Sequence, residues 1–165
     1  MLPLKTLSME AIPTALAKAD RYRLLNEPLF SESICMDILS VDPENQEALV
    51  ILLLALTDQF GHSYKLAEIE PKSVIARLKS DYDKAYYAGI VDERRAKATL
   101  DSSVPHSAFV AYDFLTSAME HYERAAEIRP AGNDDALLRW NTCTRLMNSH
   151  GVKPRNEDPR DSFLE

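Results

Sequence analysis

Glycine is scarce in this chain, which has four glycines among 165 residues. Phosphate-binding and dinucleotide-binding loops need glycines at fixed spacings, because only glycine lets the backbone approach a phosphate closely at positive φ. No such spacing occurs in the sequence. The scarcity therefore argues against nucleotide-binding loops of these kinds.

Cysteine is also scarce, and the two cysteines, Cys35 and Cys143, are far apart in the chain. Each lies in an apolar pattern of helical spacing, so we expect two small buried residues rather than a redox pair or a zinc site. The four histidines have no metal-ligand spacing with Cys, Asp or Glu. We therefore predict no metal and no cofactor, and a reducing cytoplasm as the compartment.

Basic residues are outnumbered by acidic ones, 19 to 26, for a formal net charge of −7. General attraction to nucleic acid or to anionic lipid is not expected at this charge. The longest apolar run, residues 48–56, has about half the length that spans a bilayer. Polar residues and Pro13 interrupt the apolar N-terminal segment, so we expect neither a signal peptide nor a membrane segment.

Negative charge is concentrated in residues 31–60, which hold six acidic residues and no Lys or Arg. Two interpretations fit this segment. It is either a solvated helix face or a surface that attracts a basic segment of a partner.

Apolar residues recur every three to four positions through most of the chain, which predicts helices and no strands. The expected helices are 13–27, 29–41, 46–60, an amphipathic stretch over 62–80 that Pro71 kinks or splits, 82–99, 106–129, and a last one capped by Asn133 and leaving at His150-Gly151. We therefore expect one all-α domain over residues 1–150. Residues 151–165 are polar and contain two prolines, which predicts a flexible or loosely docked tail.

A spacing of four, three and five residues occurs twice, in Ser31, Cys35, Ile38 and Pro43 and again in Ala118, Tyr122, Ala125 and Pro130. The order of small, bulky, small and proline resembles the second helix of a tetratricopeptide repeat. Residues 40–45 resemble the turn of that family, and residues 85–89 resemble the start of a further repeat.

The resemblance covers residues 12 to about 150. It implies a right-handed superhelix of helix-turn-helix pairs, about three pairs plus a C-terminal capping helix. The repeat spacing exceeds the family period of about 34 residues. Two insertions are therefore expected, near residues 64–72 and 100–105.

The resemblance also implies a concave groove, formed by the first helix of each pair, that binds a peptide or helix of a partner. Its groove positions fall on Leu16, Ala17, Asp20, Val50, Ile51, Leu54, Tyr86, Tyr87, Ile90, Arg94, Leu138, Asn141 and Arg145. Among these we select as partner-binding residues Tyr86, Tyr87, Arg94, Leu138, Asn141 and Arg145. The Lys and Asn residues of the subclass that clamps a C-terminal carboxylate are missing, which excludes that specificity.

Each selected residue also has a purely structural interpretation. Asn141 and Arg145 lie four residues apart, so they either clamp a carboxylate or a peptide backbone, or satisfy neighbouring groups. One ring of Tyr86 and Tyr87 belongs to the core, and the other is free for the groove. Arg94 lies in the charged run 93–97, which is either a solvated face or a contact for an acidic ligand.

We therefore expect a non-enzymatic protein-binding module with a protein or peptide partner. The alternative is a self-associating, chaperone-like protein, such as the type III secretion chaperones with tetratricopeptide repeats, and a homodimer belongs to this alternative. A helical enzyme is the third interpretation, although no motif marks an activated serine or cysteine.

Overall fold

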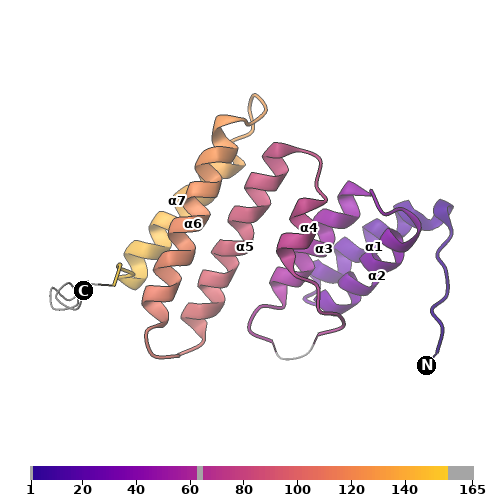
Figure 1. Cartoon of the computed structure of the whole chain (residues 1–165), viewed down its shortest axis with the longest axis horizontal. Helices are drawn as coiled ribbons and strands as arrows, with labels where there is room; N and C mark the ends of the chain where they lie inside the picture. Colours follow the sequence, from indigo (N-terminus) through magenta and orange to yellow (C-terminus); the bar gives the residue numbers. More distant parts are fainter. Residues whose placement is uncertain (1, 63–64, 156–165) are drawn as a thin grey trace, which may run out of the picture.

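The structure is a computed structural model that describes residues 2–62 and 65–155. Within these residues the chain forms a short 3-10 helix, seven α-helices and no strand (Figure 1). The elements are η1 (Met9–Ala11), α1 (Ile12–Leu24), α2 (Pro28–Val41), α3 (Gln46–Asp58), α4 (Pro71–Ala76), α5 (Asp81–Asp101), α6 (Ser107–Glu127) and α7 (Asp135–His150). The all-α prediction is confirmed for this part of the chain.

Helix starts follow local chemistry that is visible in the sequence. Pro28 and Pro71 are the first residues of α2 and α4, where the missing N–H costs no hydrogen bond. The side chains of Asn45 and Ser80 each accept a hydrogen bond from the backbone N–H three residues ahead, at 2.9 and 3.1 Å. These caps satisfy backbone donors that the first turn of a helix leaves unpaired.

The start of α7 differs slightly from the sequence prediction, whereas its end at His150-Gly151 is confirmed. The helix begins at Asp135 after the cap residue Asp134, but the Asn133 side chain still accepts the backbone N–H of Asp135 at 3.0 Å. Gly151 ends the helix with a positive φ of 59°, a conformation that glycine adopts without strain. Val152 beyond it is buried, and residues 156–165 of the predicted tail lie outside the described residues.

The stretch 62–80 differs most from the prediction. Among the described residues of this stretch, only α4, with six residues, is helical, and it starts at Pro71. Proline cannot donate the hydrogen bond that a continuing helix needs, so no helix runs through this position. A non-helical connection therefore precedes α4 in the described residues. At the second predicted insertion, 100–105, α5 ends at Asp101 and α6 begins at Ser107, and each of these helices has 21 residues.

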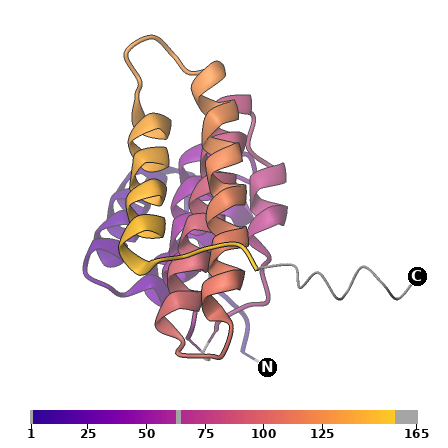
Figure 2. The ribbon, with the colours of Figure 1, turned by 90° about the vertical axis from the view of Figure 1, so that its left-hand side faces the viewer.

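Neighbouring helices pack in chain order, α1 against α2, α2 against α3, α5 against α6 and α6 against α7. The first helices of successive pairs also touch, because α1 contacts α3 and α3 contacts α5. Figure 2, viewed from the α7 end, shows α6 and α7 side by side in front of the other helices. We call the side formed by α1, α3, α5 and α7 the inner face.

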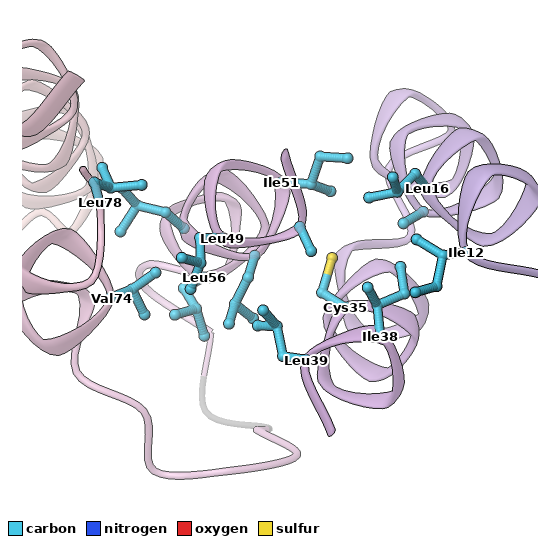
Figure 3. Packing of buried hydrophobic residues seen from close by; sticks show 14 of the residues in the cluster. Ile12, Leu16, Cys35, Ile38, Leu39, Leu49, Ile51, Leu56, Val74 and Leu78 are labelled. Atoms are coloured by element: carbon cyan, nitrogen blue, oxygen red, sulfur yellow. The ribbon is translucent and has the colours of Figure 1, made fainter. Parts of the chain in front are cut away.

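Two hydrophobic clusters form the core. The first joins α1 to α4, where Cys35 and Ile38 of α2 pack among residues of α1 and α3 (Figure 3). The second joins α5, α6 and α7 around Tyr122 and includes Cys143. Burial raises the pKa of both cysteine thiols to about 12. The prediction of two buried cysteines is therefore confirmed.

The contact between α5 and α6 depends on Gly89. A Cβ atom at this position would lie 2.5 Å from Cε1 of Tyr122, closer than van der Waals contact permits. Ala118 and Ala125 lie one turn before and one turn after Tyr122, and both are fully buried. The order of small, aromatic and small residues on α6 therefore allows close packing against α5.

Candidate functional site

An ion-pair network connects three helices of the inner face. Asp58 at the end of α3 accepts a hydrogen bond at 2.6 Å from Nε of Arg23 on α1 and another from Arg94 on α5. Arg94 also donates to the Thr57 hydroxyl at 2.6 Å. These bonds fix the spacing of α1, α3 and α5 along the inner face.

A second network of hydrogen bonds, centred on Glu93, attaches α7 to α5 and α6. Glu93 of α5 is 1% exposed and accepts hydrogen bonds from the Tyr122 hydroxyl at 2.7 Å and from Arg139 of α7 at 3.1 Å. Burial and the adjacent charge of Glu93 raise the pKa of the Tyr122 phenol. A buried carboxylate needs such partners, so Glu93 requires both α6 and α7 at their positions.

A cleft of about 220 Å³ lies between α5 and α7. Its walls are Tyr86, Asp135, Leu138, Arg139 and Thr142. Two neighbouring rings support the Tyr86 ring. It stacks on the Tyr82 ring, with ring centres 5.6 Å apart, and it meets the Tyr87 ring edge-on, with ring centres 5.2 Å apart. Leu138 is 60% exposed. We call this the α5–α7 cleft, and it brings together two predicted site residues, Tyr86 and Leu138.

Arg145 lies on the same side of α7, beyond the cleft. Its spacing of ten, seven and three residues from Asp135, Leu138 and Thr142 places all four along one helix face. The side chain is exposed and makes no hydrogen bond or ion pair with the described residues. It is therefore available as a cationic group one turn beyond the cleft.

Asn141 lies elsewhere. It lines an apolar cavity of about 310 Å³ between α6 and α7, beside Trp140 and Leu137. Trp140 is partly buried there and donates through Nε1 to Glu123 at 3.1 Å. Asn141 therefore borders the α6–α7 cavity, and the clamp that it would form with Arg145 around a ligand stays a prediction.

Arg94 and Tyr87 are held by contacts within the protein. The Arg94 side chain is 19% exposed and is engaged by Asp58 and Thr57, so it joins α5 to α3 instead of facing an acidic ligand. Tyr87 packs against both hydrophobic clusters, and burial, with a smaller contribution from Asp83, raises its pKa to about 12. Tyr87 is the core ring of the pair, and Tyr86 is the ring on the cleft.

The other groove positions implied by the resemblance divide by burial. Leu16, Ile51 and Ile90 are buried, Val50 and Leu54 are half-buried, and Ala17 and Asp20 are exposed.

Glu93 and Arg139 are not among the site residues predicted from the sequence, although their bond joins α5 to α7 at the cleft. A signal for Glu93 was present, since it stands between Ile90 and Ala96 at helical spacing on an apolar stripe. A charged residue on such a stripe is buried only when it has partners. Arg139 carries no comparable signal in the sequence.

The described residues contain no group of three or more His, Cys, Asp or Glu side chains positioned for a metal ion. None of their helices is long and apolar enough to cross a bilayer. Comparisons with protein families, curated proteins and solved structures give no match to this chain.

Proposed function

We propose that this chain is a divergent, tetratricopeptide-repeat-like interaction module that binds a segment of a protein partner on its inner face. Three observations support the repeat interpretation: the antiparallel helix pairs, the first helices in succession along one face, and the close packing of Gly89 against Tyr122. The α5–α7 cleft is the anchor point of the partner segment.

The exposed leucine at the cleft carries the proposal. Leu138 is 60% exposed beside the supported ring of Tyr86, and tyrosine rings held rigidly at a surface are common binding anchors. An apolar side chain of the partner fits between these two residues. Asp135 and Arg145, of opposite charge, lie at the two ends of this α7 face and orient the segment electrostatically.

The test compares two adjacent leucines. Leu138 faces the α5–α7 cleft, whereas Leu137 is 44% exposed and lines the α6–α7 cavity. Both are substituted by aspartate, and partners are captured from native lysate and identified by mass spectrometry, with circular dichroism as the folding control. Capture that is lost in folded Leu138→Asp and retained in Leu137→Asp supports the cleft. Equal capture by wild type and both variants contradicts it.

Self-association is the second candidate function, and the α6–α7 cavity favours it. The lining of this cavity is mostly apolar and includes the exposed Leu137. A second copy that covers this surface would shield it from water. Sedimentation equilibrium tests this, since Leu137→Asp is expected to abolish a dimer that Leu138→Asp leaves intact.

A further inference from the structure

A segment that precedes the first helices exposes two leucines. Leu2 and Leu4 are 92% and 89% exposed, the highest values among the large apolar side chains of the described residues. Leu7 packs against the first hydrophobic cluster and fixes the segment to the α1 end of the molecule. Apolar side chains at such exposure are stabilised when another surface covers them. Residues 2–8 therefore present apolar surface that has no partner within the described chain.

The backbone of this segment is suited to binding. Pro3 fixes its own φ and restricts Leu2 to extended or polyproline conformations. Residues 2–7 belong to no helix and form no hydrogen bond among the described residues. A segment restricted in this way loses less conformational entropy on binding than a fully flexible one. Lys5 is exposed and is the one charged residue among residues 2–8, so the segment is cationic.

The α5–α7 cleft offers the complementary chemistry. Leu138 presents an apolar side chain that is 60% exposed. Of the two charged residues that line the cleft, Arg139 is bonded to Glu93, whereas Asp135 forms no ion pair among the described residues. Leu138 and Asp135 are three residues apart and are therefore neighbours on the surface of α7. The cleft thus combines an apolar contact with an adjacent, unpaired negative charge.

The segment and the cleft lie at opposite ends of the molecule. The segment is at the α1 end, and α7 is at the other end, with α3 and α5 between them (Figure 1). A copy of the segment that occupies the cleft therefore comes from another molecule. We infer that the α5–α7 cleft binds residues 2–8 of a second copy of this chain. Leu4 covers Leu138 there, and the lysine that follows pairs with Asp135. The inference rests on the proposed binding of a segment in this cleft and names its occupant.

Two variants, each of which removes one half of the contact, test the inference. Leu4→Asp alters the segment and keeps the cleft, whereas Leu138→Asp alters the cleft and keeps the segment. Sedimentation equilibrium on the full chain is expected to show association of the wild type that each variant weakens roughly tenfold or more. An equimolar mixture of the two variants is expected to form pairs, because the intact segment of one chain fits the intact cleft of the other. This complementation is specific to a contact between two different surfaces.

Matched controls separate this contact from the general effect of an added charge. Leu24→Asp and Leu137→Asp make the same change at exposed leucines outside the segment and the cleft, and are expected to leave the association unchanged. A charge exchange tests the ion pair separately. Lys5→Glu and Asp135→Lys are each expected to weaken the association, and the double variant is expected to regain part of it. Circular dichroism checks that each variant is folded.

Three results would overturn the inference. A wild type that stays monomeric up to millimolar concentration would show that residues 2–8 do not bind a second copy. Association that Leu137→Asp abolishes and Leu138→Asp leaves intact, the pattern of the second candidate function, would assign it to the α6–α7 cavity. Association without complementation between Leu4→Asp and Leu138→Asp would show that the segment and the cleft do not meet.

Capture of partners from lysate distinguishes this inference from the proposed function. A monomeric wild type whose capture of a partner still depends on Leu138 removes the second copy as the occupant and leaves the cleft as a binding site. Failure of both the association and the capture removes both proposals.

Discussion

At the scale of single residues, Gly89 faces the ring of Tyr122 across the contact between α5 and α6. Glycine inside a helix costs roughly 0.5–1 kcal/mol relative to alanine, and here the close approach of two helices requires it. An alanine at this position would gain helix propensity but would clash with the Tyr122 ring, so the two effects on stability have opposite signs.

We predict that Gly89→Ala lowers the free energy of unfolding by about 1–3 kcal/mol, because the buried ring cannot move away from the new methyl group. Urea denaturation measures this. In a Tyr122→Leu background the same substitution is expected to be neutral or stabilising, since the ring that clashes is gone. A destabilisation of equal size in both backgrounds would contradict the packing argument.

Tyr87 leads to a prediction about alkaline pH. Its pKa is about 12 in the folded protein against 10.0 for an unperturbed phenol. The stability linked to this shift is present in full below pH 10 and is lost as the pH rises towards 12, because the unfolded chain gives up the proton first.

Phenolate absorbance and circular dichroism between pH 9 and 12, on wild type and Tyr87→Phe, measure this effect. The variant is expected to show a shallower loss of stability above pH 10 and one late-titrating phenol fewer. Identical pH profiles for the two proteins would show that Tyr87 is not the group responsible.

At the scale of elements, α7 is held by the second hydrophobic cluster and by the buried carboxylate of Glu93, which accepts a hydrogen bond from Arg139. Removing one partner of a buried ion pair destabilises more than the pair itself contributes, because the remaining charge is left uncompensated. Arg139 donates to Glu93 from a position that is about a third exposed, which reduces the effect through solvent screening.

We therefore predict that Arg139→Met costs roughly 1.5–3 kcal/mol of unfolding free energy, the range for a hydrogen bond to a charged group. Glu93→Gln in the same background restores part of this loss, because it removes the uncompensated charge and keeps an acceptor for Tyr122. Urea denaturation of the single and double variants measures both terms. A double variant less stable than Arg139→Met would contradict this account.

The sequence predicts most helices well and one poorly. Strong apolar periodicity, prolines and capping residues mark α1, α2, α3, α5, α6 and α7. The stretch 62–80 has apolar residues at helical spacing, but Pro71 prevents a continuous helix, and apolar spacing alone does not show where the chain leaves the core.

The cleft is predicted in part, for a related reason. The groove pattern of the family that the chain resembles points to Tyr86 and Leu138, and both line the cleft. It does not show that Arg94 meets Asp58, 36 residues earlier in the chain, nor that Asn141 turns towards α6. These contacts depend on the packing of neighbouring helices, which a single sequence does not specify.

At the scale of the whole molecule, the two hydrophobic clusters are joined by few contacts. Tyr87 packs against both clusters, Leu54 of α3 packs against the second and Val91 of α5 belongs to the first. The network at Asp58 also joins α1, α3 and α5. In stacked helical proteins such interfaces determine whether the chain unfolds as one unit.

We predict that Asp58→Ala uncouples the two halves. Hydrogen exchange in rising urea is expected to show α3 and α5 losing protection together in the wild type, and at separate urea concentrations in the variant. Asp37→Ala, which removes one acidic side chain on α2 outside the network, serves as the control. Loss of protection at one common concentration in Asp58→Ala would show that apolar contacts alone couple the halves.

The short helix α4 has a mechanical consequence. The two halves are α1 to α4 and α5 to α7, and the outer side is the side opposite the inner face. On the outer side, only the six-residue helix α4 and its connections join the halves among the described residues. On the inner face, the Arg23–Asp58–Arg94 bonds hold them together. We therefore expect any bending between the halves to have its axis near Asp58. The distance from α3 to α5 on the inner face would then change least, and the width of the outer side most.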